Sequence, residues 1–381
     1  MTKKVLVVGL GGVGGYALHL LARYPGIKLI GADVREKFAR EKVSNVYYDI
    51  FFQKAILPHI EHKRIDLNDI EGTAEILKEI EPDVILNQTT LQSWWVVHHI
   101  PEEIRLKISD TYPGAGLGPW TPVHLTLTYK LMQAVHKAKL DTHVVNGSWP
   151  DCVNPVLSKV GLAPTVGMGN FALLEPMIIR IVSDKLKVPA SNVSVTMIGH
   201  HAMVMPIWGK GSAVNTPYYL KIRVFDQDVT NKFDIEKDIW VECPKYAGPE
   251  ALWGTQQEFI ASCVTRNVLA ILFDTGEIVH APGPEGLPGG YPVRLSAKGA
   301  EVVVPDGMTK EKAIKINEEA QKYEGIEKIK EDGTVVCTDH ATQIMKEVLD
   351  YDCKELKLDE CERKAKELIS AYNKLSDKYK G

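Results

Sequence analysis

The sequence predicts an α/β protein in which an N-terminal, doubly wound parallel sheet is followed by an α+β domain. Three observations lead to this fold class. Apolar strands alternate with helices through the first 150 residues, a glycine-rich turn joins the first strand to the first helix, and later segments alternate as antiparallel strands do. The expected domains are residues 1–155 and residues 156–381, the second of which is expected to bind substrate and to mediate oligomerisation.

The N-terminal elements follow the order of a βαβ unit. Residues 3–8 predict a strand, residues 16–24 a helix, and residues 27–33 a second strand, all within about 30 residues. The pattern continues with a helix and a strand, and then a second such pair, over residues 68–81, 83–90, 121–138 and 142–147.

The remaining segments are more varied. Residues 110–120 are rich in glycine and proline and predict a loop, and residues 148–155 (SWPDCVNP) predict a polar turn at the carboxyl edge of the sheet. Beyond them we expect a helix over 171–187, antiparallel strands over 193–208 and 218–229, and a helix over 258–272. A long loop over 281–292 and a mostly helical stretch of about 70 residues complete the prediction.

Length and composition limit the classes of function. With 381 residues, 45% of them hydrophobic, the chain can bury a large core and divide into two domains. The net charge of −4 disfavours nucleic acid as a partner. No apolar run approaches the roughly 20 residues that span a membrane, and no secretion signal is evident. The six cysteines form no CxxC pair, so we expect reduced thiols in a cytoplasmic protein.

The turn after the first strand predicts a nicotinamide dinucleotide site. Gly9, Gly11 and Gly14 fit the G-x-G-x-x-G pattern of a Rossmann fold, with Gly12 and Val13 inside the turn. The three glycines respectively permit the tight turn, the approach of the backbone to the pyrophosphate, and the packing of helix against strand. The start of the helix then offers unpaired N–H groups to the phosphates.

Acidic and amide side chains extend this expected cofactor site. Asp33, 19 positions after Gly14, ends the second strand and is expected to accept hydrogen bonds from the adenosine ribose, which favours NAD. Arg35 can instead hold a 2′-phosphate, so NADP stays possible. Further candidate cofactor contacts lie at the ends of strands and in loops: Asp66, Asn87, Thr89, Asn146 and Asn154. For Asp66, a place in an acidic surface loop is the alternative.

Three central segments, residues 146–155, 164–170 and 198–203, resemble the lactate/malate dehydrogenase family and its relatives, the family 4 glycosidases. In this resemblance Asn154 and Pro155 match a turn beside the nicotinamide, and Gly199-His200-His201 matches a G-x-H element that brings a histidine to substrate. It implies that His201 accepts a proton, with His200 as the reserve, and that residues 111–120 form a mobile loop over the substrate. The opening third is also similar to saccharopine and opine dehydrogenases.

The chain departs from that resemblance at three positions. The family's substrate-binding arginine is absent from residues 175–179, with Arg180 one turn later, and the aspartate that orients the histidine is replaced at best by Glu175. The cysteine that holds the glycosidase metal is absent at residues 167–169, so no metal ligands are predicted. Cys152 is either a ligand or, as we favour, a small buried apolar residue. The expected substrate contacts are Tyr112, Trp120, Asn154 and Arg180.

Together these observations predict an NAD(P)-dependent oxidoreductase that moves a hydride between the nicotinamide and a small polar hydroxy or amino compound. Two alternatives remain open at this point. One is a redox-assisted glycosidase or lyase in which NAD is not consumed, and the other is a non-catalytic NAD-sensing protein. The resemblance further implies that the chain forms a homodimer or homotetramer. It also implies that the chain binds a small-molecule substrate.

Overall fold

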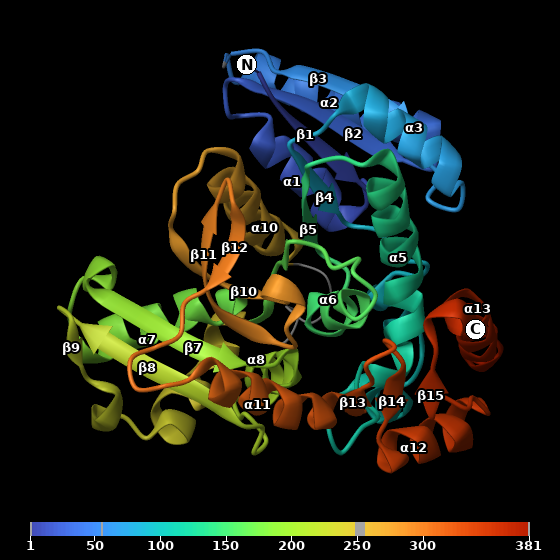
Figure 1. The fold of residues 1–381 in the computed structure, drawn as a ribbon. Coiled ribbons are helices and arrows are strands. Elements are labelled where there is room, and N and C mark those ends of the chain that lie inside the picture. Colours follow the sequence, from blue (N-terminus) through green and yellow to red (C-terminus); the bar gives the residue numbers. More distant parts are fainter. Residues whose placement is uncertain (1, 55, 248–255, 380–381) are drawn as a thin grey trace.

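The computed structural model describes residues 2–54, 56–247 and 256–379 (Figure 1). Its first sheet has six parallel strands in the order β3-β2-β1-β4-β5-β6, which is the strand order of a Rossmann fold. The strands are β1 (Lys3–Val8), β2 (Ile27–Asp33), β3 (His59–Arg64), β4 (Val84–Asn87), β5 (His143–Asn146) and β6 (Val166–Gly167). The predicted doubly wound parallel sheet is therefore confirmed.

Both faces of this sheet are buried, which explains the continuous apolar run of β1. Val5 and Val7 belong to the hydrophobic core on one face, and Leu6 and Val8 belong to the core on the other. The first core includes side chains of α1 (Gly12–Leu21), α2 (Glu36–Phe52) and α10 (Gln257–Leu272). The second includes side chains of α3 (Ile70–Ile80), α5 (Thr121–Ala138) and α6 (Pro150–Ser158).

The two halves of the sequence are interleaved at this sheet. Strand β6 follows residue 155, the expected end of the first domain, and α10 from the C-terminal half packs against α1. A single cut at residue 155 therefore does not separate every element of the parallel sheet from the rest of the chain.

The segment expected as a polar turn at residues 148–155 is mostly helical, so that part of the prediction is wrong. Pro150 occupies the start of α6, where the fixed φ of proline favours a helix. Pro155 lies inside the helix and has no N–H for the carbonyl of Asp151. The N–H of Gly289 donates to that carbonyl instead (3.3 Å), and the helix continues.

The second sheet is antiparallel, as predicted. Its order is β10-β11-β7-β8-β9, with β12 paired to β11. The strands are β7 (Val193–Gly199), β8 (Tyr218–Val224), β9 (Gln227–Asp228), β10 (Ile278–Pro282), β11 (Gly290–Ser296) and β12 (Gly299–Val302). Strand β7 ends at Gly199 instead of reaching residue 208, and α8 (Val204–Lys210) follows, so the histidine pair lies just beyond a strand end.

The C-terminal stretch contains a small sheet as well as the expected helices. Strands β13 (Ile326–Ile329), β14 (Val335–Cys337) and β15 (Glu355–Leu356) pair in that order. They lie among α11 (Lys310–Ala320), α12 (Asp339–Leu349) and α13 (Cys361–Ser376), and α13 packs against α5 (Figure 1). The other described α-helices are α4 (Glu102–Ser109), α7 (Glu175–Leu186) and α9 (Cys243–Ala247).

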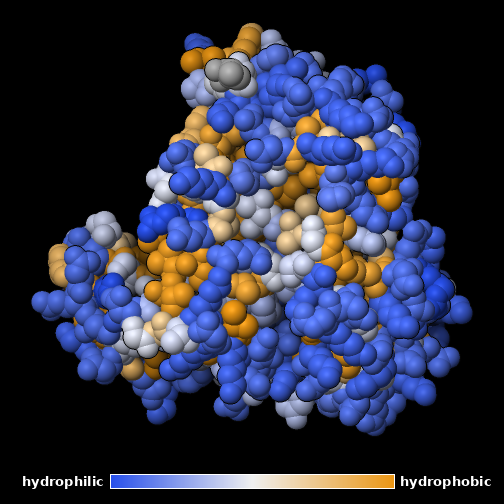
Figure 2. All heavy atoms as spheres, in the orientation of Figure 1, coloured by the Kyte–Doolittle hydropathy of each residue, from blue (hydrophilic) through white to orange (hydrophobic). Residues whose placement is uncertain are grey.

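In the face drawn in Figure 2, many apolar side chains show in the middle, and the periphery is mostly hydrophilic with apolar atoms at its upper and left edges. Among the described residues, none of the helices has the length and apolar character needed to cross a membrane. All six cysteines are buried free thiols.

Gly14 tests the packing of α1 on the glycine turn. A Cβ on Gly14 would lie 1.9 Å from the carbonyl oxygen of Gly9, so Gly14→Ala forces α1 away from the turn. We expect a loss of about 1–3 kcal/mol in the free energy of unfolding, as for other overpacked sites. Urea denaturation measures it. Gly11→Ala is the matched control, because no atom lies within 4 Å of a Cβ there; an equal loss in both variants would contradict the argument.

Candidate active site

The glycine turn has the geometry that a bound pyrophosphate needs. Gly9 has a φ of +90°, in the region that favours glycine, and a Cβ there would lie 2.7 Å from the carbonyl oxygen of Gln88. Gly11 precedes α1 without any side-chain cap, which leaves the first N–H groups of a ten-residue helix available to an anion. The absence of a Cβ at Gly12 makes room for the side chain of Gln257 from α10.

Asp33 lies beside this turn as an anion. Its Oδ2 accepts from the N–H of Leu10 (3.2 Å), and its Oδ1 accepts from Nε of Arg35 (2.9 Å). Burial by itself would raise the pKa of the Asp33 carboxyl, but the hydrogen bonds from Arg35 and Leu10 outweigh it and lower the pKa. The guanidinium of Arg35 also lies over the ring of Phe38, 4.0 Å from its centroid.

The amides expected at the cofactor form a buried chain instead of an open surface. The Nδ2 of Asn87 donates to Oδ1 of Asn146 (3.1 Å), the Nδ2 of Asn146 donates to Oδ1 of Asn154 (3.0 Å), and the Nδ2 of Asn154 donates to the carbonyl of Gly283 (3.1 Å). Thr89 donates its N–H and hydroxyl to Oδ1 of Asn87. These side chains hold the carboxyl ends of β4 and β5 in place.

Two expected cofactor contacts therefore occupy other positions. Asn154 and Pro155 lie inside α6, because the helix begins at Pro150, so they do not form the turn after β5. Asp66 lies in a loop after β3, where its Oδ1 accepts from the side chain of Asn68 (3.0 Å). Neither Asn154 nor Asp66 lines the cavity described next.

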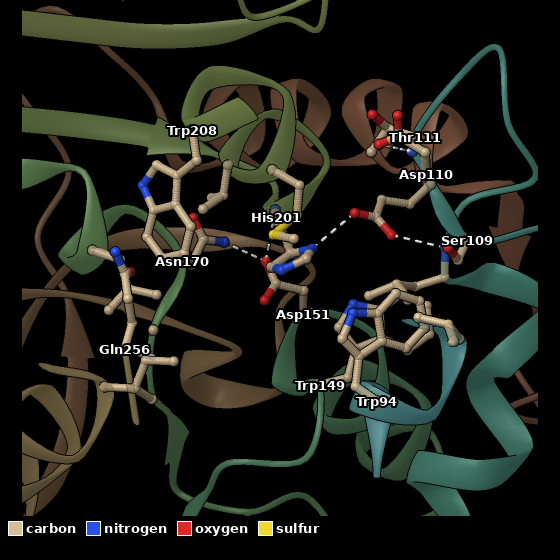
Figure 3. A pocket seen from close by; sticks show the side chains of 18 of the residues that line it. Trp94, Ser109, Asp110, Thr111, Trp149, Asp151, Asn170, His201, Trp208 and Gln256 are labelled. Carbon is tan, nitrogen blue, oxygen red and sulfur yellow. Dashed lines mark hydrogen bonds and ion pairs between the residues drawn. The ribbon is translucent and has the colours of Figure 1, made fainter. Parts of the chain in front are cut away.

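A cavity of about 470 Å³ extends from Val13 of the glycine turn to His201. Val13 and Gln88 line it at the turn, and His201 lines it at the end of β7, whereas His200 does not. Trp149 and Trp208 are also in the wall, and Figure 3 shows these two indoles on opposite sides of His201. The volume lies in the range of about 300–1,000 Å³ typical of ligand pockets.

His201 is held by a buried carboxylate from the C-terminal segment. Its Nδ1 lies 2.8 Å from Oε1 of Glu324, a residue only 1% exposed. The N–H of His201 donates to Oδ1 of Asp151 (3.1 Å), which also accepts from Nδ2 of Asn170. Because Nδ1 is paired with Glu324, Nε2 is the ring nitrogen that can exchange a proton with a substrate.

The two carboxylates set the protonation of His201. Burial opposes its charged form, but Glu324 and Asp151 outweigh burial and raise the pKa of His201. Burial would likewise raise the pKa of Glu324, but the charge and hydrogen bond of His201 lower it. For Asp151 burial wins over the neighbouring histidines and raises the pKa.

Two other histidines near His201, His200 and His124, stay neutral. Burial lowers the pKa of His200, which accepts the N–H of Ala202 at Nδ1 (3.3 Å). His124 lines the cavity with its Nδ1 3.3 Å from Oγ of Ser148. Burial, and then the charge of His201, lower the pKa of His124 to about 4.

A buried glycine segment holds Glu324 in position. The N–H of Leu117 donates to Oε2 of Glu324 (3.0 Å), and a Cβ on Gly116 or Gly118 would lie within 2.3–2.7 Å of the Glu324 backbone. Residues 114–120 are buried. Residues 114–120 are thus packed against Glu324, whereas the resemblance implied a mobile loop over the substrate.

The remaining expected substrate contacts lie outside the cavity. Tyr112 is 51% exposed and faces His340, and the ring of Trp120 packs in the core between Trp94 and Tyr372. Arg180 lies on α7 over the ring of Tyr246. None of the three lines the cavity, although Leu117 of the same segment as Tyr112 and Trp120 does.

Glu175, expected as the substitute carboxylate, pairs with another histidine. Its Oε2 lies 3.2 Å from Nδ1 of His280. The prediction from the sequence missed Asp151 and Glu324, the two carboxylates that contact His201. It also missed Arg105, a cavity residue that is 9% exposed and ion-paired to Glu102 (3.0 Å). In the sequence, only the glycines of residues 114–118 indicated that another part of the chain packs closely there, and they do not identify Glu324 as that part.

The described residues contain no group of three or more side chains suited to hold a metal ion. Cys152 is fully buried and its Sγ lies 3.7 Å from Oγ1 of Thr121. Burial raises the pKa of this thiol to about 12. Cys152 therefore has the surroundings of a small buried apolar residue, the reading that the sequence favoured.

Solved lactate and malate dehydrogenases share this fold. The lactate dehydrogenase of Cryptosporidium parvum, solved with lactic acid and nicotinamide adenine dinucleotide, superimposes with a TM-score of 0.61 at 16% identity, over 85% of this chain and 96% of that one. The malate dehydrogenase of Plasmodium falciparum gives 0.58 at 16% identity, over 84% and 98%. The lactate dehydrogenase of Eimeria maxima, with NADH and oxamate, gives 0.61 at 15% identity, over 84% and 92%.

No protein-family model matches the sequence, and no curated protein matches it either. The similarity thus lies in the fold, at identities of 15–16% for these three structures. It confirms the predicted architecture, a Rossmann domain followed by a second domain as in lactate and malate dehydrogenases.

Proposed function

We propose that this chain is an NAD-dependent oxidoreductase that oxidises a hydroxyl group of a small molecule to a carbonyl. The observation that carries the proposal is the pair of His201 and Glu324 in a cavity that begins at the glycine turn. The shared fold of dehydrogenases supports it. The function stays within the class predicted from the sequence, with a hydroxy compound preferred over an amino compound because His201 is placed as a base.

The residues of the cavity divide the work of the reaction. NAD held by the start of α1 and by Asp33 would supply the acceptor for the hydride of the substrate's carbinol carbon. Nε2 of His201 takes the hydroxyl proton, and the anion of Glu324 stabilises the resulting imidazolium. The buried Asp151 fixes the backbone of His201 through its N–H. In the reverse direction, the protonated His201 returns the proton to the carbonyl oxygen.

The fit of NAD rests on the uncapped start of α1 and on Asp33. The helix start suits the pyrophosphate, and the Asp33 carboxylate suits two ribose hydroxyls. A 2′-phosphate would bring like charges together at Asp33, although Arg35 lies beside it. We therefore keep NAD as the proposed cofactor.

Asp33→Asn tests this cofactor preference. We expect NAD affinity to fall by about ten- to a hundredfold, the effect of losing hydrogen bonds to a charged acceptor. The affinity for NADP should fall less or rise, because Arg35 remains. Isothermal titration with both cofactors measures the ratio, and Asp306→Asn, an exposed carboxyl outside the cavity, is the control. An unchanged preference would place the ribose elsewhere.

A substrate panel tests the proposed function itself. Hydroxy acids, sugars, polyols and amino acids are incubated with the protein and NAD or NADP, with and without EDTA. The proposal predicts one NADH per carbonyl formed. Turnover without net NADH would instead favour the redox-assisted glycosidase, and NAD binding without turnover of any compound would favour the sensing protein.

The expected homodimer or homotetramer also stays a proposal. Large rings near the end of α2 are exposed, among them Phe51 (59%) and Phe52 (80%). An exposed apolar surface of this kind is typical of contacts between proteins, and a second copy of the chain is the partner we propose.

A further inference from the structure

Several residues that line the cavity carry a buried polar atom that makes no hydrogen bond within the described chain. Besides that of Gln88 at the glycine turn, these atoms are Oγ1 of Thr111, Nε1 of Trp149, Oδ1 of Asn170 and Nε1 of Trp208. Each of these four residues is at most 6% exposed. Leaving buried donors and acceptors without partners destabilises a protein, so such groups call for an explanation. A bound ligand that supplies the missing partners would provide one.

The four atoms differ in what they offer a ligand. The two indoles only donate, the amide oxygen of Asn170 only accepts, and the hydroxyl of Thr111 does either. Figure 3 shows Trp208 and Asn170 on one side of His201 and Trp149 on the other, with Thr111 further out. Hydroxyl groups can both donate and accept, so a ligand with several hydroxyls can satisfy this mixed set.

The charges in the wall do not favour an anionic ligand. The charged side chains that line the cavity are two cations and four carboxylates: Arg105, Lys210, Glu102, Asp110, Asp151 and Glu324. Arg105 is ion-paired to Glu102 (3.0 Å), and Lys210 is ion-paired to Asp110 (2.8 Å). The two remaining carboxylates surround His201. A carboxylate or phosphate group on the substrate would therefore enter a cavity whose wall has more negative than positive groups.

The indoles add flat apolar walls to these polar groups. Trp94, Trp149 and Trp208 all line the cavity. The C–H faces of a cyclic polyol can pack on such rings while its hydroxyls reach polar atoms at the edges. Mixed donors and acceptors, aromatic walls and the lack of excess positive charge thus describe one kind of ligand.

We propose that the substrate is a neutral, polyhydroxylated ring, a sugar or a cyclic polyol, an inference that rests on the proposed oxidoreductase function. One ring hydroxyl is oxidised. Its carbinol C–H bond breaks, the hydride reduces NAD to NADH, the O–H proton passes to Nε2 of His201, and a carbonyl forms. The other hydroxyls pair with Thr111, Asn170 and the two indoles.

The test compares NADH formation from D-glucose and myo-inositol with that from D-gluconate, L-lactate and L-malate. A neutral ring should give a kcat/KM at least tenfold above those of the three acids. Thr111→Val removes one hydroxyl and keeps the shape, and Trp208→Phe removes one N–H together with part of the indole wall. Each should raise KM for the preferred ring about three- to tenfold, with the Kd for NADH unchanged.

Thr216→Val is the matched control, because Thr216 is equally buried and its Oγ1 is also unpaired, but it does not line the cavity. It should leave KM unchanged. The inference is overturned if an acid is the preferred substrate, or if Thr111→Val and Thr216→Val behave alike. In both cases NADH forms and the proposed function stands. If the protein neither binds NADH nor forms it from any compound, the proposed function fails together with the inference.

Discussion

Replacing His201 by asparagine should lower the rate of hydride transfer by about 10²–10⁴-fold, the usual contribution of a positioned general base. Asparagine keeps a polar group in the cavity but cannot accept the hydroxyl proton. NADH binding should stay unchanged, because the glycine turn and Asp33 are untouched. Steady-state NADH formation measures the first effect and NADH fluorescence titration the second.

The matched control is His340→Asn, an exposed histidine outside the cavity. It should keep full activity. If the His201 variant also kept full activity toward the substrate found in the panel, the proton would have to leave by another group, and the assignment of the base would be wrong.

Replacing Glu324 by glutamine should have the second largest effect, through His201. The N–H of Leu117 donates to one carboxylate oxygen of Glu324, and Nδ1 of His201 pairs with the other oxygen. In the variant the amide oxygen is drawn to Leu117, so its NH₂ faces Nδ1 of His201. That arrangement puts the ring proton on Nε2 and prevents it from accepting the hydroxyl proton. We expect a loss of about 10²-fold or more in kcat.

The pH dependence supplies a readout that misfolding would not produce. Glu324 and Asp151 raise the pKa of His201, so oxidation, which needs the neutral ring, should rise with pH through a midpoint above the ordinary value of 6.5. Reduction needs the protonated ring and should fall over the same interval. Glu324→Gln removes an anion and should move both midpoints to lower pH. Asp151 and the neutral His124 and His200 remain in place and set the new midpoint.

Glu175→Gln provides the comparison for this shift, because Glu175 pairs with His280 away from the cavity. Its pH profile should match that of the unchanged protein. An unshifted midpoint in Glu324→Gln would show that Glu324 does not govern the charge of His201.

The local pattern of the sequence was sufficient for four strands of the parallel sheet, β1, β2, β4 and β5, but not for β3 or β6. Strand β1, the glycine turn, β2 and Asp33 lie within 33 residues, and their spacing is set by the fold of one βαβ unit. The helix expected over residues 121–138 has those bounds in the structure. Helix α6 was missed because a polar segment with two prolines resembles a turn, and Gly289 supplies the compensating hydrogen bond from far along the chain.

The candidate site depended on contacts that no local pattern shows. His201 could be predicted from its place in G-x-H, but its partner Glu324 lies 123 residues further on. The carboxylate expected nearby, Glu175, belongs to His280. Strand β7 ends at Gly199, just before the two histidines, and only packing of the whole chain decides that His201, and not His200, lines the cavity.

The central claim is that hydride passes directly from a substrate carbon to NAD while His201 takes the proton. The most direct measurement uses the panel's best substrate with deuterium on the carbinol carbon, and follows the label by mass spectrometry. The account predicts one deuterated NADH for each carbonyl product. Carbonyl or hydrolysis product that forms while the cofactor stays oxidised and unlabelled would contradict it.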